Sequence, residues 1–399
     1  MDKKPEKLVP EVRFKGFTDD WEQHKLGKVS KIVRGASPRP IKDPKWFEKD
    51  SHVGWIRISD VTEQNGRIRH LTQHLSKAGE TKTRVLEQPH LLLSIAASVG
   101  FPAINYVPIG VHDGFLIFLN SKFNIDYMFY WLEKFRPLWR KYGQPGSQIN
   151  LNSDIVSNTR LALPKEAEQS KVSNFLNKVE LLITLQQRKL NQLKRLKTAM
   201  LQQLLANQSF PKVRFNNFKN SWKDYRLGEV FDEFSVKSKR ENEYKLLSST
   251  TSGMESRSGR VSGHSNIGYK VIDNGDIVLS PQNLWLGNIN LNNMGKGIVS
   301  PSYHTFKIVN ANPIFVNFQL KTKKMLFEYK MVSVQGASVV RRNLDMDAFK
   351  KIVIKIPNEK EQIKIASLFS SISNIINNHQ NKLTQLTTLK KYLLQKMFI

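Results

Sequence analysis

The stretch VPEVRFKGFTDDW at residues 9–21 is written a second time as FPKVRFNNFKNSW at residues 210–222. Aligned without a gap, residues 10–29 and 211–230 are identical at 9 of 20 positions, where unrelated segments would share about one. This repeat indicates that the chain contains two copies of one structural plan.

A second repeat closes each half of the chain. LPKEAEQSK at residues 163–171 corresponds to IPNEKEQIK at residues 356–364, and the correspondence continues to the end of the chain. The copies are 201 residues apart at the openings (210 − 9) and 193 apart at the closing segments (356 − 163). The two halves therefore share their ends and differ in their middles.

Both closing segments are predicted to be long helices. Pro164 and Pro357 stand where a helix can begin, and glutamates follow each proline, near the positive end of the helix dipole. Apolar residues then recur three and four positions apart, and a helix of about 40 residues would be ~60 Å long. Two such stripes in one chain are expected to pack on each other as an antiparallel pair. The alternative is a coiled coil between two copies of the chain.

The middles have the pattern of mixed α and β structure. Strands are predicted for four runs between glycine and proline turns: WIRIS (55–59), LLLSIAA (91–97), GFLIFLN (114–120) and DIVLS (276–280). Each middle also has an aromatic-rich helix, at residues 126–135 and after Asn312-Pro313. We therefore expect an α+β fold with two pseudo-repeated mixed α/β domains, at 1–163 and 209–356, separated by two long antiparallel helices, at 164–208 and 357–399.

Charge is the first indication of function. The chain has 62 Lys and Arg against 34 Asp and Glu, a formal net charge of +28, which favours a polyanionic partner such as nucleic acid.

The absence of cysteine excludes a disulfide scaffold and fits a reducing compartment. The first residues lack the apolar core of a signal peptide, and the longest apolar run, residues 91–97, is too short to span a membrane. We expect a cytoplasmic protein.

Catalytic motifs are missing from the sequence. It contains no G-x-x-x-x-G-K-[ST], no G-x-G-x-x-G after a strand, no H-E-x-x-H and no Pro-Pro, which the Asn/Asp-Pro-Pro-aromatic motif of adenine methyltransferases requires. His70 and His74 have the spacing of metal ligands on a helix, but no carboxylate cluster accompanies them. We expect the chain to bind and not to catalyse.

The chain resembles the specificity subunit of type I restriction-modification enzymes over its whole length. The resemblance rests on the repeated opening, on WIRISDV (55–61), on AASVGFPAI (96–104) and on the two helices that begin with the repeated proline and glutamates. It implies two target recognition domains held apart by two antiparallel helices, each domain reading one half of an asymmetric, two-part sequence in double-stranded DNA.

The resemblance also implies partners and places the cofactors on them. Two modification subunits would bind S-adenosylmethionine and methylate adenine, and two restriction subunits would use ATP and Mg to translocate and cut DNA. No cofactor is expected on this chain, and it would not be an enzyme by itself.

Candidate contacts follow from the side chains that read base edges and hold phosphates. The candidate DNA-binding residues, chosen in WIRISD and in three polar loops, are Arg57, Ser59, Gln144, Ser147, Gln148, Arg257, Arg260, His264, Gln335, Ser338, Arg341 and Arg342. On the helices, the candidate partner-binding residues are Leu182, Leu193, Leu196, Leu386 and Leu389. Glycine- and serine-rich loops with arginines are also common as simply solvated segments.

Two other functions fit part of this pattern. A standalone sequence-specific DNA-binding regulator would bind DNA without a methyltransferase partner, although no helix-turn-helix spacing is visible. An RNA-binding or architectural coiled-coil protein would explain the charge and the helices. It would not explain two dissimilar middles inside matching ends.

Overall fold

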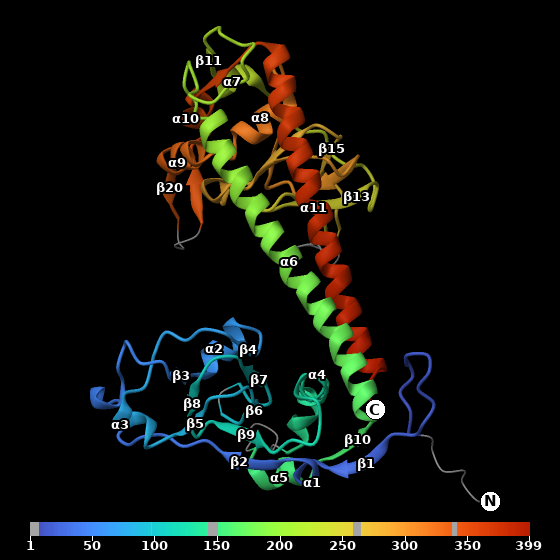
Figure 1. The fold of residues 1–399 in the computed structure, drawn as a ribbon. Helices are drawn as coiled ribbons and strands as arrows, with labels where there is room; N and C mark the ends of the chain where they lie inside the picture. The colour runs from blue at the N-terminus through green and yellow to red at the C-terminus, as the bar shows by residue number, and fades with distance from the viewer. Residues whose placement is uncertain (1–7, 97, 143–150, 258–264, 337–340) are drawn as a thin grey trace, which may run out of the picture. The chain divides into compact units, whose positions relative to one another are not determined.

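The computed structural model describes residues 8–96, 98–142, 151–257, 265–336 and 341–399. The chain divides into two compact units (Figure 1). Unit 1 comprises Met1–Gln186 and Lys382–Ile399, and unit 2 comprises Gln187–Asn381. Each unit is therefore built mostly from one half of the chain and completed by a helical segment that belongs to the other half.

Unit 1 contains a five-stranded sheet of order β2-β9-β6-β7-β4 and a three-stranded sheet of order β3-β8-β5. In the second sheet β3 and β8 are parallel, and β5 is antiparallel to β8. The strands of the two sheets are β2 (Lys31–Arg34), β3 (Gly54–Ile56), β4 (Arg67–Ile68), β5 (Arg84–Leu86), β6 (Leu91–Ser94), β7 (Pro102–Asn105), β8 (Ile109–Val111) and β9 (Phe115–Leu119).

Unit 2 repeats this topology with a different sequence, except that its described strands include no counterpart of β4. The order β12-β19-β16-β17 corresponds to β2-β9-β6-β7, and β13-β18-β15 corresponds to β3-β8-β5, again with the first two strands of the latter sheet parallel. Two features are added, β14 beside β13 and a β20-β21 hairpin. The strands are β12 (Phe231–Phe234), β13 (Lys245–Ser249), β14 (Met254–Ser256), β15 (Lys270–Ile272), β16 (Ile277–Leu279), β17 (Ile289–Leu291), β18 (Gly297–Val299), β19 (His304–Ile308), β20 (Ser333–Gln335) and β21 (Arg342–Leu344).

Short helices cover these sheets. The aromatic helix α4 (Ile125–Phe135) buries six consecutive residues, and the Asn124 side chain caps it by accepting from the backbone N–H of Tyr127. In unit 2, Asn312 caps α8 (Pro313–Gln319) in the same way. The remaining short helices are α1 (Leu26–Val29), α2 (Ile58–Glu63), α3 (Lys77–Glu80), α5 (Ser153–Asn158), α7 (Leu227–Val230), α9 (Lys323–Met331) and α10 (Met346–Lys351), with 3-10 turns at Pro44–Trp46, Arg136–Tyr142 and Leu284–Leu286.

The two long helices are α6 (Glu166–Leu204) and α11 (Glu359–Lys396), as the sequence predicted. They lie side by side within each unit (Figure 1). In unit 1 the Lys390 ammonium lies 3.1 Å from Glu180, and in unit 2 the Lys197 ammonium lies 2.8 Å from the Ser373 hydroxyl. Because α6 leads out of unit 1 and α11 leads into it, the paired segments are antiparallel. The apolar stripes therefore have a partner inside the chain, as expected, and need no second copy.

The repeated opening pairs with the strand that precedes each long helix. In unit 1, β1 (Glu22–Lys25) is antiparallel to β10 (Arg160–Leu163), and in unit 2, β11 (Lys223–Arg226) is antiparallel to β22 (Val353–Ile356). The tryptophans of the openings, Trp21 and Trp222, are buried. Both tryptophans therefore pack locally on their own unit.

A buried ion pair joins each opening to its long helix. Arg13 binds Glu168 through two hydrogen bonds of 2.7 and 2.8 Å, and Arg214 binds Glu361 through two of 2.6 and 2.7 Å. The glutamates are 2% and 0% exposed, so two-point pairing with arginine offsets the cost of burying their charge.

The next residue of each helix fixes the aromatic helix. The Gln169 side chain accepts from the backbone N–H of Asn124 at 2.9 Å, and the Gln362 side chain accepts from that of Asn312 at 2.7 Å. Each glutamine also donates to the carbonyl of the proline that precedes its helix. We call the arginine, glutamate, glutamine and capping asparagine of each unit its joint.

One predicted strand is wrong beyond its second residue. WIRIS does not run as a strand to Ser59, because β3 ends at Ile56 and α2 begins at Ile58. The backbone N–H and the guanidinium of Arg57 both bind the buried carboxylate of Asp60, which caps the new helix. The other three strand predictions correspond to β6, β9 and β16. Within the described residues, no helix is long and apolar enough to cross a membrane.

Candidate nucleic-acid interface

Arg57 lies at the rim of an open pocket of about 450 Å³ in unit 1, the unit 1 pocket. Since β3 and β8 are parallel, their carboxyl ends meet at one edge of the sheet, and Arg57 and His112 are the residues that directly follow them. Phe47 and Trp55 form the aromatic part of the lining, and Gln73 adds an amide. The pocket thus combines an apolar wall with several hydrogen-bond donors.

The Arg57 guanidinium is held in place by neighbours. Its Nε and Nη2 bind Asp60 at 3.2 and 2.9 Å, and Nη2 also donates to the Thr72 hydroxyl at 3.0 Å. The N–H groups of Nη1 have no partner in the described parts of the chain, and the side chain is 44% exposed. A guanidinium that is oriented on one side and free on the other is suited to bind an external acceptor.

His112 adds an imidazole ring to the lining of the same pocket. Its Nδ1 accepts from the backbone N–H of Gly114 at 2.8 Å, so in the neutral ring the proton lies on Nε2. Burial lowers the pKa of His112 below its ordinary value, which favours the neutral ring. Ser59, in contrast, does not line the pocket; it lies exposed on α2, where its carbonyl accepts from Thr62.

Unit 2 has an open pocket of about 430 Å³, the unit 2 pocket, whose lining differs in chemistry. Apart from Pro281, the described lining residues carry hydroxyl or amide groups, and none has a formal charge. Ser249 ends β13, Gln282 and Asn283 follow β16, and Tyr303 lies after β18. The Gln282 side chain is exposed and makes no hydrogen bond within the described residues. Asn283 Oδ1 is buried and accepts none there.

The predicted residues near β20 and β21 lie on one hairpin. Gln335 and Arg342 face each other in its register. The Arg342 guanidinium donates to the Ser333 carbonyl at 2.7 and 3.2 Å, so it fastens the hairpin on itself. Its backbone N–H donates to the Gln282 carbonyl at 3.1 Å, which brings the hairpin next to the unit 2 pocket.

The remaining candidate DNA-binding residues divide into exposed ones and ones the structure does not describe. Arg341 precedes β21 and Arg257 follows β14, and both side chains are exposed. The candidates that lie outside the described residues are Gln144, Ser147, Gln148, Arg260, His264 and Ser338.

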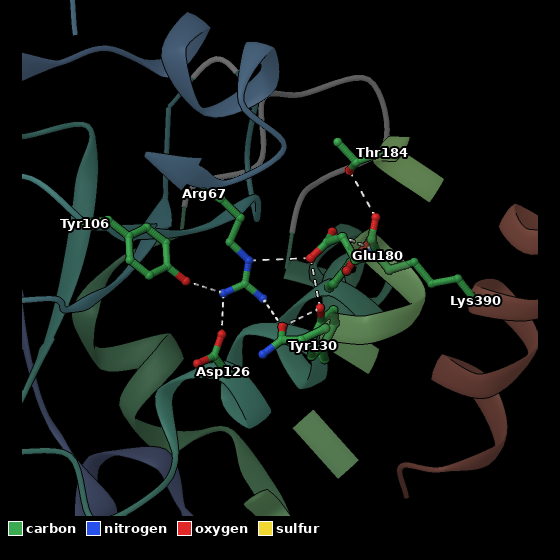
Figure 2. Close-up of polar contacts among 9 residues, drawn as sticks. Arg67, Tyr106, Asp126, Tyr130, Glu180, Thr184 and Lys390 are labelled. Atoms are coloured by element: carbon green, nitrogen blue, oxygen red, sulfur yellow. Dashed lines mark hydrogen bonds and ion pairs between the residues drawn. The ribbon is translucent and has the colours of Figure 1, made fainter. Parts of the chain in front are cut away.

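A network of charged groups, which we call the Arg67 network, ties the β-structure of unit 1 to its helices. Figure 2 shows Arg67 between Asp126, on α4, and Glu180, on α6. Tyr130 donates to Glu180 at 2.8 Å, and Lys390, on α11, lies 3.1 Å from the same carboxylate. Four elements that are distant in sequence are thereby fastened at one place.

The electrostatics of this network favour its charged arginine. Burial opposes the charge on Arg67, but Tyr130, Tyr106, Asp126 and Glu180 together raise its pKa above the ordinary value. Burial, and next to it the charge of Glu180, raise the pKa of Tyr130, so that its hydroxyl remains a donor.

The corresponding place in unit 2 has the opposite polarity. Counted from the capping asparagines, Glu133 corresponds to Lys321, and by the 193-residue offset Glu180 corresponds to Ser373. Lys197 donates to the Ser373 hydroxyl, and Lys321 donates to the side-chain amide oxygen Oδ1 of Asn290. Burial, together with the charge of Lys197, lowers the pKa of Lys321 to about 8. Burial also lowers the pKa of Lys197.

The predicted partner-binding leucines lie on exposed and half-buried faces of α6 and α11. Leu182, Leu196 and Leu389 are exposed, whereas Leu193 and Leu386 are half-buried. Ile375, which the sequence analysis did not single out for binding, corresponds to Leu182 and is equally exposed. We call Leu182 with Leu389 in unit 1, and Leu196 with Ile375 in unit 2, the exposed apolar pairs; Leu181, Leu185 and Ile363 on the same helices are exposed as well.

Several residues with a defined place in the structure were not found from the sequence. Both members of the joint ion pairs are repeated in the sequence, so a search for repeated opposite charges could have found them. Arg67, His112 and Gln282 belong to no repeat or motif, and no sequence signal marks them.

Comparisons with known proteins agree with this architecture. The family model described as "Type I restriction modification DNA specificity domain" matches the chain twice, at residues 18–195 and 219–388. A solved specificity subunit of a type I restriction-modification system from M. genitalium is 12% identical, with a TM-score of 0.62, and the match covers 98% of this chain and 99% of that one. A chain from a structural study of the assembly and conformational transition of a type I system is 16% identical, with a TM-score of 0.56 and the same coverage.

At these identities the likeness to solved structures is one of fold, whereas the two family matches span most of the sequence. They coincide with the two topologically equivalent units. The chain belongs to the family of type I restriction-modification DNA specificity subunits.

Proposed function

We propose that this chain reads an asymmetric, two-part sequence in double-stranded DNA, with one part read by each unit. The observation that carries the proposal is the repeated topology with two different open pockets, one rich in donors and aromatic rings and one lined by hydroxyls and amides. The net charge of +28 supports a DNA partner, because neutralising phosphates supplies most of the sequence-independent affinity.

The proposal includes a division of labour with partner subunits. Two modification subunits would supply S-adenosylmethionine and methylate adenine, and two restriction subunits would supply ATP- and Mg-dependent translocation and cleavage. This chain would bind and not catalyse, and it would act in the cytoplasm, where it meets the DNA.

The exposed apolar pairs on α6 and α11 are the proposed docking positions for the modification subunits. Leu182 and Ile375 are 50% and 45% exposed, and Leu196 and Leu389 are 51% and 43% exposed. Because corresponding positions of the repeat carry the same kind of side chain, two identical partners would meet equivalent surfaces. Leu193 and Leu386 would contribute at the half-buried edge of these surfaces.

Single-molecule methylation mapping of host DNA, with and without this chain, tests the proposal. We expect one asymmetric two-part motif to lose its adenine methylation when the chain is removed. Unchanged methylation in a strain that produces the modification subunits would contradict it, and tight sequence-specific binding by the chain alone would then favour a standalone regulator.

The spacing of the two half-sites gives a second test. A helical spacer fixes the separation of two reading domains by geometry. Lengthening α6 and α11 by matched insertions is expected to change the number of base pairs tolerated between the half-sites. An unchanged gap would show that the helices do not set it.

A further inference from the structure

The unit 1 and unit 2 pockets occupy the same place in the repeated topology. β3 and β8 in unit 1 correspond to β13 and β18 in unit 2, and both pairs are parallel. Arg57 and His112 follow the carboxyl ends of the first pair, and Ser249 and Tyr303 lie at and after the carboxyl ends of the second. Two pockets of similar size therefore stand at one equivalent edge of the two units.

The chemistry of the two pockets differs more than their position. In the unit 1 pocket the available groups are mainly donors, namely the free side of the Arg57 guanidinium, the Nε2–H of His112 and the Lys42 ammonium. The described lining of the unit 2 pocket has no charged donor. Within the described residues Gln282 makes no side-chain hydrogen bond, Asn283 Oδ1 is a buried acceptor without a donor, and the hydroxyls of Thr251 and Ser280 make none.

These two sets of groups match different base edges. Guanine presents two acceptors, N7 and O6, in the major groove, and arginine is its commonest partner. Adenine presents an acceptor, N7, beside a donor, the N6 amino group, and an amide side chain matches that pair. A pocket with charged donors therefore favours guanine, and a pocket with amides and no charged donor favours adenine.

We infer that the two pockets are the base-reading sites of the two units, with Arg57 reading a guanine in one half-site and Gln282 reading an adenine in the other. Asp60 and Thr72 orient Arg57 from behind, as a reading arginine requires. The inference rests on the proposed function and adds to it the residues and the kind of base each unit recognises.

The test uses the chain assembled with its modification subunits. Methylation of a cognate duplex is compared with methylation of duplexes that carry one substituted base pair at each position, for the wild type and for Arg57→Ala, Gln73→Ala and Gln282→Ala. We expect Arg57→Ala and Gln282→Ala each to lose discrimination at one position of one half-site, within the range of about 5- to 150-fold for a base contact. Arg57 should fall at its lower end, because only Nη1 is free. Gln73→Ala should lose discrimination in the same half-site as Arg57→Ala. The other half-site should keep its discrimination.

Matched controls separate base reading from general charge or stability. Arg160 is an exposed arginine on β10, and Asn274 is an exposed amide at the amino end of β16, the opposite end from Gln282. Arg160→Ala and Asn274→Ala are expected to keep wild-type discrimination at every position. An equal change in these controls would overturn the inference.

The outcomes also separate this inference from the proposed function. A two-part motif in the wild type with unchanged discrimination in the Arg57, Gln73 and Gln282 variants would overturn the inference and leave the proposed function standing. The absence of any two-part motif in the wild type would instead contradict the proposed function. If Arg57→Ala abolished all methylation, the Gln73 variant, whose side chain makes no hydrogen bond within the described residues, would decide for the unit 1 pocket, and unchanged discrimination there would overturn that assignment.

Discussion

The two units have the same joint, but they differ at the place where unit 1 has the Arg67 network. Both join an arginine of the opening to a buried glutamate of the long helix, and both use the following glutamine to hold the capping asparagine of the aromatic helix. Beyond the joint, unit 1 has carboxylates around Arg67 and Lys390, whereas unit 2 has Lys197 and Lys321 among neutral side chains.

The difference shows which parts of the repeat are constrained. Removing one member of a buried ion pair strongly destabilises the fold, so the arginine and the glutamate of each joint depend on each other. The Arg67 network and the corresponding groups of unit 2 can differ in polarity, as long as the groups of each remain paired or neutral. The joint is therefore a structural feature common to both units, and the segments between the repeated ends can differ and form different pockets.

The largest expected effect comes from breaking a joint. Glu361→Ala would leave Arg214 unpaired in a site where the glutamate is fully buried, and removing one partner of such a pair costs about 3–5 kcal/mol. Glu168→Ala should cost unit 1 a similar amount. Chemical denaturation of the purified chain measures both, and the double variant Arg214→Met/Glu361→Met should recover much of the loss. A cost below about 1 kcal/mol would mean that the joint is not a shared constraint.

Arg67→Met tests the Arg67 network, which only unit 1 contains. It would leave Asp126 without its arginine and remove one partner of Glu180, and we expect a loss of about 2–4 kcal/mol. Hydrogen exchange should show faster opening in unit 1 and no change in unit 2. The exposed neighbour Arg69, changed to Met, is the matched control and should cost about 0.5 kcal/mol or less. Equal effects at the two positions would contradict the account of the network.

Lys321→Met tests the corresponding place in unit 2, and we expect the substitution to stabilise unit 2. The folded pKa of about 8 lies below that of an unfolded lysine, about 10.4, so the unfolded chain binds more protons between these values. Wild-type stability therefore rises with pH across that window, and the cost of the buried charge is fully present below pH 8.

The expected gain from this substitution is at most about 3 kcal/mol at pH 7, shrinking towards pH 10. Denaturation curves of both proteins at several pH values measure it. Lys323→Met, an exposed lysine on α9, should change neither the stability nor its pH dependence. A destabilised Lys321→Met protein at pH 7 would show that its bond to Asn290 outweighs the burial of charge.

The smallest effect on stability is expected from the exposed apolar pairs. Leu182→Ala with Leu389→Ala, or Leu196→Ala with Ile375→Ala, should each change the free energy of unfolding by about 0.5 kcal/mol or less. Each double variant should nevertheless lose one of the two proposed modification subunits, which native mass spectrometry would show. Two retained subunits in both variants would place docking elsewhere.

The parts of the fold that the sequence predicts are those that repeat or have a strong period. The long helices follow from apolar spacing and from the uninterrupted runs after Pro164 and Pro357. The prediction of a strand over WIRIS was wrong after Ile56, because a local contact between Arg57 and Asp60 caps a helix there. The Arg67 network could not be predicted, because residues 67, 126, 180 and 390 meet only after the chain has folded. The pockets depend in the same way on which strands lie parallel.

Exchanging the middle segment of one unit tests most directly whether the two units recognise their half-sites independently of each other. Residues 231–311 contain the unit 2 pocket residues and none of the joint, and they can be replaced by the corresponding segment of a family member with a known target. Methylation mapping should then show the half-site of the donor in place of one original half-site, with the other half-site and the gap unchanged. A change in both half-sites, or in neither, would contradict the account.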